Sequence, residues 1–499
     1  MPILLAAGTC IALVAKAVAS NCLKSGTFNL TFATHVKLIA PVYRSVLSIG
    51  LCWGLVACGI TMPPSTVRMD APAAWQAPLP HQGSVTDLSQ WWQQQGDPLL
   101  VEFIAAAQKI SPSVAVAVSR MESARASQVS AGAALMPRVD ASVGVSRGVS
   151  QPAVPVATTV QGGFQAAWEI DLVGANRAVS HAAVAQWQGS QAQWHDARVA
   201  VAAEVAQVYY SLHTCYALLD VVQQDAQSRA QTAHVFARGV QAGLVAPPVA
   251  ALARASAAEG RSNVTQQSTA CAADVQALVA LTGMPESDIR QKISPTLYRQ
   301  NPLLGLVLSA VPAQAIAQRP DVFAAERDVV VASAQVGSAQ AQRYPRLTLA
   351  GSIGALHSST QGVDSRLDTW SMGPLAINLP IFDAGQRAAQ VDLAQTRYAE
   401  AVTVYQAKVR YAVREVEGAL LSLQSTAART ADANLAAQGY TESWLATQTR
   451  AAQGFASLTE LEEARRMALA AQTARIALTL ERNRAWIALY RAMGGGFNP

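Results

Sequence analysis

The chain carries an internal duplication, which limits its possible folds more than any other feature. Residues 111–146 align without a gap on residues 319–354, and later matches keep the same order, including Gly243 with Gly454. Chance does not preserve order over such a distance. The sequence therefore predicts two copies of one unit of about 200 residues, a period much longer than that of a solenoid repeat.

The sequence predicts the same series of elements in both copies. The series begins with an Ala-rich helix, over about 99–136 in the first copy and about 319–343 in the second. Both helices end at a proline, as helices commonly do. Two strands follow, and then roughly 65 residues without proline, which at 1.5 Å per residue would form a helix of about 100 Å. A turn at Gly243 or Gly454 reverses the chain, and a shorter helix returns beside the long one, because helices of this length need partners along their sides.

The predicted strands alternate apolar and polar side chains. In the first copy the apolar positions run from Val139 to Val145 and then from Val160 to Leu172. This period of two places apolar side chains on one face of a sheet and polar side chains on the other. Four such strands per chain cannot close a barrel, because bacterial membrane barrels begin at about 8 strands. Several chains must therefore contribute to one barrel, whose polar inner face would form a water-filled pore.

In the second copy, one strand is expected over 347–353 and another from about Trp370 to Ile381. The alternation of the latter switches near Gly373-Pro374, where we expect a β-bulge.

The composition excludes three classes of protein. Hydrophobic residues make up 51% of the chain and charged residues 14%, against about 25% charged in ordinary domains, so the chain is not intrinsically disordered. No mature segment has the roughly 20 uninterrupted apolar residues of a spanning helix, which excludes a polytopic helical membrane protein. The net charge of +5 arises mostly in residues 1–57 and gives no support for binding nucleic acid.

Residues 1–57 are predicted to form a signal region that is absent from the mature protein. They hold basic but no acidic residues, and an apolar run precedes Leu55-Val56-Ala57-Cys58. This ending is similar to a bacterial lipobox, in which the cysteine is lipidated and becomes the first mature residue. An ordinary signal peptide with an incidental cysteine is the alternative. Residues 1–41 suggest an over-extended start, and residues 58–97 a lipidated N-terminal tether.

Cys215 and Cys271 lie at equal distances in sequence on either side of Gly243. If Gly243 is the tip of an antiparallel helical hairpin, both thiols lie at the same height. In an oxidising compartment such a pair is expected to close into a disulfide. The alternative is two small buried thiols on different faces.

Several motifs occur in a fixed order and with duplicated spacing over about residues 58–496. They are Cys58 in its lipobox, Trp91-Trp92 with Asp97-Pro98, Gln318-Arg319-Pro320-Asp321-Val322, Tyr344-Pro345-Arg346-Leu347 and Pro380-Ile381-Phe382-Asp383-Ala384-Gly385. On these motifs the chain resembles the TolC-like outer-membrane efflux factor family, in its NodT/OprM-type lipoprotein branch. Ser111 departs from the family, which usually has Asn there.

The resemblance implies a mixed fold, all-α plus a membrane β-barrel, in which four strands per chain contribute to a shared trimeric barrel of twelve strands. It further implies a lipid-anchored homotrimer in the outer membrane with a long periplasmic extension. The partners would be a periplasmic adaptor, or membrane fusion protein, and an inner-membrane pump of the RND type. The chain would be a passive conduit that exports small molecules. The alternatives are a type I protein-secretion conduit and a non-transport trimeric coiled-coil surface lipoprotein.

The domain boundaries on this reading are 98–290 for the first copy, 291–318 for a connecting segment and 319–496 for the second copy. No phosphate loop, nucleophile elbow or zinc-binding motif occurs in the sequence, so we expect no catalysis, no metal and no cofactor other than the lipid on Cys58. His195 and His213 are expected to be solvated or capping residues. Asp171 and Asp383 precede the long helices and are expected to cap them.

Two candidate sites lie at the predicted hairpin tips. Glu460, Glu462 and Glu463 follow Gly454, and in a trimer they could form a ring of carboxylates that gates the periplasmic end of the pore. A solvated helix start favoured by the helix dipole is the alternative. Gly243-Leu244 and Gly454-Phe455 leave apolar side chains at exposed tips, where an adaptor could dock, unless the side chains only pack within the turn.

Overall fold

The computed structural model describes residues 60–77, 90–149, 156–293 and 312–497. The predicted signal region and Cys58 lie outside these residues, and the description concerns the unit Ile60–Pro499. The elements of the first copy are α3 (Trp91–Gln94), α4 (Pro98–Ile110), α5 (Pro112–Ala133), β1 (Arg138–Gly148), β2 (Ala157–Ile170), α6 (Ala175–Gln241), α7 (Pro247–Thr282) and α8 (Glu286–Lys292). Those of the second are α9 (Pro312–Ala317), α10 (Pro320–Ala341), β3 (Arg346–Thr360), β4 (Val363–Asn378), α11 (Gln386–Ala452) and α12 (Leu458–Ala492), with a 3-10 turn at Gly494–Gly496.

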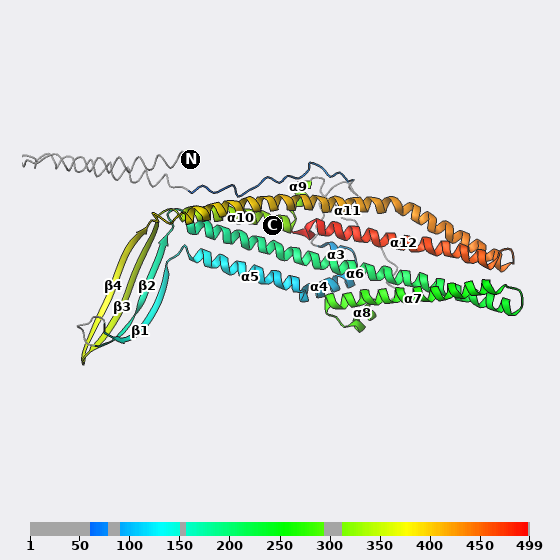
Figure 1. The fold of residues 1–499 in the computed structure, drawn as a ribbon, viewed down its shortest axis with the longest axis horizontal. Helices are drawn as coiled ribbons and strands as arrows, with labels where there is room; N and C mark the ends of the chain where they lie inside the picture. Colours follow the sequence, from blue (N-terminus) through cyan, green and yellow to red (C-terminus); the bar gives the residue numbers. More distant parts are fainter. Residues whose placement is uncertain (1–59, 78–89, 150–155, 294–311, 498–499) are drawn as a thin grey trace, which may run out of the picture. The chain divides into compact units, whose positions relative to one another are not determined.

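Two long helical hairpins form most of the described structure (Figure 1). Helices α6 and α11 each contain 67 residues, and they pair with α7 of 36 residues and α12 of 35 residues. At 1.5 Å per residue the long helices extend about 100 Å. The predicted length and order of these helices are confirmed. Helix α6 also contacts α5, α10 and α12, so it joins the two copies.

The first predicted helix is wrong as a single element, because the chain bends by 53° between α4 and α5. Pro112 occupies the first turn of α5, where its missing N–H costs nothing. The Ser111 hydroxyl accepts from the amide of Val114 at 3.5 Å and caps the new helix. No single described helix is long and apolar enough to cross a membrane, and this bent pair meets the criteria of length and composition only when taken together.

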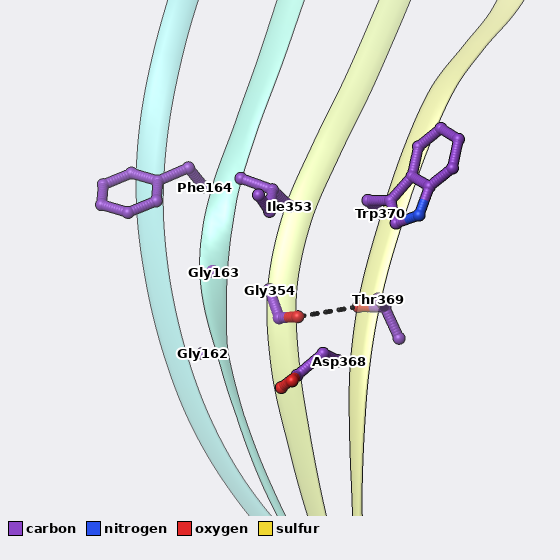
Figure 2. A pocket seen from close by; sticks show the side chains of 8 residues that line it. All are labelled: Gly162, Gly163, Phe164, Ile353, Gly354, Asp368, Thr369 and Trp370. Atoms are coloured by element: carbon purple, nitrogen blue, oxygen red, sulfur yellow. Dashed lines mark hydrogen bonds between the residues drawn. The ribbon is translucent and has the colours of Figure 1, made fainter.

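The four strands form one antiparallel sheet in the order β1-β2-β3-β4. Phe164, Ile353 and Trp370 lie side by side on β2, β3 and β4 and are 58%, 63% and 79% exposed (Figure 2). In the adjacent row Gly163 pairs with Gly354. One face is therefore apolar and the other polar or small, as the period-two pattern predicts.

The sequence pattern predicts one detail of the sheet correctly and another wrongly. The predicted bulge is confirmed, because β4 has one extra residue, at Gly373-Pro374, opposite the stretch from Leu349 to Gly351. The predicted start of the last strand is wrong, because β4 begins at Val363, directly after a tight turn at Gln361-Gly362. The positive φ of 82° at Gly362 suits glycine, and the turn brings both strands into register immediately.

Aromatic side chains join the start of the first copy to the end of the second. The ring of Trp91 stacks on Tyr490 of α12 at a centroid distance of 5.0 Å, and Trp92 meets the same ring at 4.9 Å. Asp97 caps α4 through the amides of Leu99 and Leu100 and also accepts from the Tyr209 hydroxyl at 2.7 Å. This cluster is the largest part of the buried core.

A buried arginine fixes the start of the second copy. Arg319 is 6% exposed, and its guanidinium forms ion pairs with Asp321 at 2.9 Å and Glu415 at 2.8 Å. It also donates to the carbonyl of Ala492 at the end of α12. Three helices of the second copy thus converge on one cation, whose burial is compensated by charged and hydrogen-bonded partners.

Cys215 and Cys271 form a disulfide between α6 and α7, the pairing that the symmetric spacing about Gly243 predicts. Their Cα atoms lie 5.5 Å apart and both side chains are buried. The bond therefore joins the hairpin of the first copy covalently. In the second copy the same level of the α11–α12 hairpin has the Arg429–Glu481 ion pair instead, with contacts of 2.6 and 3.0 Å.

Replacement of both cysteines by serine is expected to lower the free energy of unfolding by at most about 4 kcal/mol, because the bond closes a loop of 56 residues in the unfolded chain. Thermal unfolding followed by circular dichroism measures the change. Reductant should lower the midpoint of the wild type and leave that of the Cys215→Ser, Cys271→Ser variant unchanged. Equal midpoints for the two proteins without reductant would contradict a stabilising role.

Candidate functional site

The two hairpin tips have the same backbone geometry. Gly243 and Gly454 adopt φ of 72° and 80°, and the next amide closes each turn, Leu244 onto Gly239 and Phe455 onto the carbonyl of Arg450, both at 2.8 Å. These are the left-handed helix ends that favour glycine. Leu244 is 83% exposed and Phe455 73% exposed, so neither side chain packs within its own turn.

The three glutamates after Gly454 lie in three different environments. Glu460 completes a capping box with Ser457 at the start of α12 and lies 3.6 Å from Arg450. Glu462 is 8% exposed and accepts a hydrogen bond of 2.7 Å from the hydroxyl of Ser228 on α6. Glu463 is exposed. Glu462 is therefore buried against α6 while Glu460 and Glu463 are exposed, so a ring of all three does not match this conformation.

A second contact joins the start of α12 to the first copy. Arg465 donates to the backbone carbonyl of Gln224 on α6 at 2.8 Å, and its guanidinium lies 5.3 Å from the ring of Trp444 on α11. We call this bond and the Ser228–Glu462 bond the latch. No local sequence pattern points to Ser228 or Gln224, because they lie more than 230 residues in sequence from Glu462 and Arg465.

Between the latch and the tips lies a cavity of about 490 Å³. Phe236 and Leu252 of the first hairpin line one part of it, and Thr459, Glu462 and Arg466 of α12 line another. Arg229 of α6 also lines it and pairs with Asp225 and Glu259, at 2.7 and 3.0 Å. The region near the tips thus combines exposed apolar surface with charged groups from both copies.

The two aspartates before the long helices act as caps, as predicted, although glycines occupy the N-cap positions. Asp171 accepts from the amide of Arg177 at 2.9 Å, and Asp383 accepts from the amide of Arg387 at 3.2 Å. Each carboxylate also pairs with the side chain of the same arginine. The joint between strand and long helix is therefore built in the same way in both copies.

The prediction of a solvated or capping residue is wrong for His213. His213 is 3% exposed and its ring lies 4.3 Å from that of Tyr209, one helical turn earlier on the core face of α6. Burial lowers the pKa of His213 to about 4. His195 is half-buried, and burial lowers its pKa as well. No group of three or more His, Cys, Asp or Glu side chains among the described residues is placed to hold a metal ion.

Residues 60–77, which we call the strap, lie against the helices of the second copy. The amide of Thr61 donates to Gln340 at 3.1 Å, and the carbonyls of Pro63 and Pro64 accept from Ser333 and Tyr398. The amides of residues 76 and 77 donate to the two carboxylate oxygens of Glu417. The strap therefore begins near the sheet end of α10 and extends along α11.

The sequence profile of the outer membrane efflux protein family matches residues 103–284 and 311–495. The chain belongs to this family. The matched segments coincide with the two copies and include both hairpins, while the strap lies outside them.

Among the relatives of this family member, outer membrane protein OprJ of Pseudomonas aeruginosa is 29% identical over 470 residues, which is 91% of this chain and 96% of OprJ. The toluene efflux pump outer membrane protein TtgI of Pseudomonas putida is 27% identical and covers 81% of this chain and 86% of TtgI. The crystal structure of the outer membrane protein VceC of Vibrio cholerae superposes with a TM-score of 0.69 at 25% identity, over 84% of this chain and 100% of that one.

Proposed function

We propose that this family member is the outer-membrane channel of a tripartite efflux system, a passive conduit through which small molecules pass from the periplasm to the exterior. The observation that carries the proposal is a two-faced sheet of four strands continuous with two helical hairpins of about 100 Å. A channel of this kind needs a periplasmic adaptor and an energised inner-membrane pump, for which we propose the RND type. The chain itself offers no motif for using energy.

The sheet supports a trimer because a single chain leaves two strands unpaired on their outer sides. Within the part of the chain that the structure describes, β1 pairs only with β2, and β4 only with β3. In a membrane the free backbone groups at such edges cost several kcal/mol each, so barrels close completely. If β4 of one protomer pairs with β1 of the next, three protomers close a barrel of twelve strands.

Two other functions are less well supported. A trimeric coiled-coil surface lipoprotein would explain the long helices but would not explain the four-stranded sheet. A type I protein-secretion conduit would have the same architecture, but the name of TtgI, a toluene efflux protein, favours small molecules as cargo. The exported compound is set by the pump rather than by any pocket that we describe.

Formation of the channel depends on the close approach of Gly163 to β3. A Cβ atom at position 163 would lie 2.5 Å from the carbonyl oxygen of Ile353, whereas one at position 144 meets only the Gln161 side chain at 3.7 Å. Gly163→Val is therefore expected to abolish trimers in native mass measurements and conductance in planar bilayers. Gly144→Val should retain both. A conducting monomer, or a conducting Gly163→Val protein, would overturn the shared barrel.

We propose that the latch, rather than a ring of three glutamates, holds the periplasmic end of the channel closed. Hydrogen bonds that involve a charged group contribute about 1.5–3 kcal/mol. Loss of one such bond is expected to raise the open population about tenfold or more. The second hairpin is the part that can move, because only the first is joined by a disulfide.

Ser228→Ala and Arg465→Gln are expected to increase the single-channel open probability in planar bilayers. Glu463→Gln is the matched control, since Glu463 is exposed and lies outside the latch. If Glu463→Gln or Glu460→Gln alone changes conductance and its block by divalent cations, while the latch variants behave like the wild type, the carboxylate ring is the gate instead.

Adaptor docking is proposed at Gly243, Leu244, Gly454 and Phe455, because the exposed Leu244 and Phe455 side chains present apolar surface at both tips. A photo-crosslinking residue at position 455 should capture the adaptor, and one at the equally exposed position 435 of α11 should not.

Lipidation of Cys58 is proposed because the strap fixes the residues that follow it. Ile60, two residues after Cys58, lies beside Gly174 at the joint between β2 and α6. A lipid on Cys58 would therefore be attached two residues before Ile60, the first residue of the strap. The anchor and the sheet would then enter the same outer membrane.

Mass spectrometry of the membrane-extracted protein is expected to find a lipid-modified N-terminal Cys58. The Cys58→Ser variant should lack the lipid and stay in the membrane if the barrel alone holds it. A mature N-terminus elsewhere, without lipid, would refute the anchor.

A further inference from the structure

A cavity of about 360 Å³ lies among α6, α11 and α12, at the middle of the helical region. Arg475 and Arg482 line it from α12, together with Leu478, while Ala217 of α6 and Asn434 of α11 line the other sides. We call it the arginine groove. Its volume falls within the range of about 300–1,000 Å³ that small-molecule sites occupy.

The two arginines give the groove an uncompensated positive charge. None of the ion pairs among the described residues involves Arg475 or Arg482, and no Asp or Glu lines the groove. The nearest acid on α12, Glu481, binds Arg429 through both carboxylate oxygens. His213 at the base has a pKa of about 4, so it is neutral near pH 7 and adds no charge. The groove is thus suited to an anion.

The duplication explains why the groove is open. Gly454 matches Gly243 at an offset of 211 (454 − 243), which places Thr426 opposite Cys215 (215 + 211) and Arg482 opposite Cys271 (271 + 211). The first copy thus has a disulfide where the second has a buried threonine and an arginine. The Thr426 hydroxyl donates to the Leu423 carbonyl of its own helix, and Arg482 lines the groove.

Much of the rest of the lining is apolar or already hydrogen-bonded. Ile476, Leu478 and Ala433 contribute hydrocarbon surface, and the hydroxyls of Thr430 and Thr479 donate to the backbone of their own helices. The two guanidinium groups and the Asn434 amide place hydrogen-bond donors on the same lining. Arg475 and Arg482 are seven residues apart, which separates them by about 10 Å along the helix.

From this arrangement we propose that the arginine groove binds a small amphiphilic carboxylate. The carboxylate is held by Arg475 or Arg482 through charge-assisted hydrogen bonds, and the apolar body lies against Ile476 and Leu478. This proposal does not depend on the conduit function, because its test measures equilibrium binding to the purified protein and not transport.

Equilibrium dialysis of the full-length protein in lipid nanodiscs, with 2-naphthoate as the probe, tests the proposal. Saturable binding of one naphthoate per chain is expected, weakened about tenfold or more by the Arg475→Gln, Arg482→Gln double variant and by the single variant of whichever arginine holds the carboxylate. Added salt should weaken it as well. Arg410→Gln, on the exposed surface of α11 and outside the groove, is the matched control and should bind as the wild type does.

The uncharged 2-naphthamide, which has the same ring system, should bind much more weakly. Equal binding of naphthoate and naphthamide, or no loss in the Arg475→Gln, Arg482→Gln double variant with helical content and trimer mass retained, would overturn the site. Binding of inorganic phosphate without binding of naphthoate would overturn the amphiphilic class of ligand.

Discussion

The two unpaired edges of the four-stranded sheet are the constraint on which the rest of the structure depends. Among the described residues, β1 and β4 each have a neighbour on one side only, and backbone groups that lack partners in hydrocarbon are costly enough to exclude open sheets from membranes. The strands therefore need other copies of the chain. The Asp-Arg joints at the starts of α6 and α11 connect strand to helix in the same way in both copies.

Gene duplication supplied two equivalent hairpins, and the structure shows how they came to differ. The first is closed by a disulfide and lies beside the Trp91–Tyr490 core, while the second is held at the same level by a solvent-accessible ion pair and by the latch near its tip. Solvent-exposed ion pairs stabilise by less than about 1 kcal/mol. The two halves differ at equivalent positions, where Cys215 and Cys271 of the first copy correspond to Thr426 and Arg482 of the second.

The sequence predicts what depends on local periodicity and on symmetry. The 67-residue helices, the two-faced strands, the bulge at Gly373-Pro374 and the pairing of Cys215 with Cys271 all follow from patterns within one copy. The bend at Ser111 was missed because Pro112 is compatible with the first turn of a helix and gives no clear break. The burial of His213 and the Ser228–Glu462 bond were missed for a different reason. They depend on which helix faces pack together across the two copies, and a single sequence does not contain that information.

The strap connects the first half of the chain to the second. Its last residues bond to Glu417, 341 and 340 residues away, so these contacts close about two thirds of the chain into a loop. Loop closure over such a span costs about 5 kcal/mol in chain entropy, because the cost grows with the logarithm of loop length. During export the N-terminal segment emerges first, yet its binding partners on α10 and α11 exist only after most of the protein has crossed. The strap can therefore dock only after the chain up to Glu417 is available, which includes both halves of the sheet, α10 and the part of α11 that it contacts.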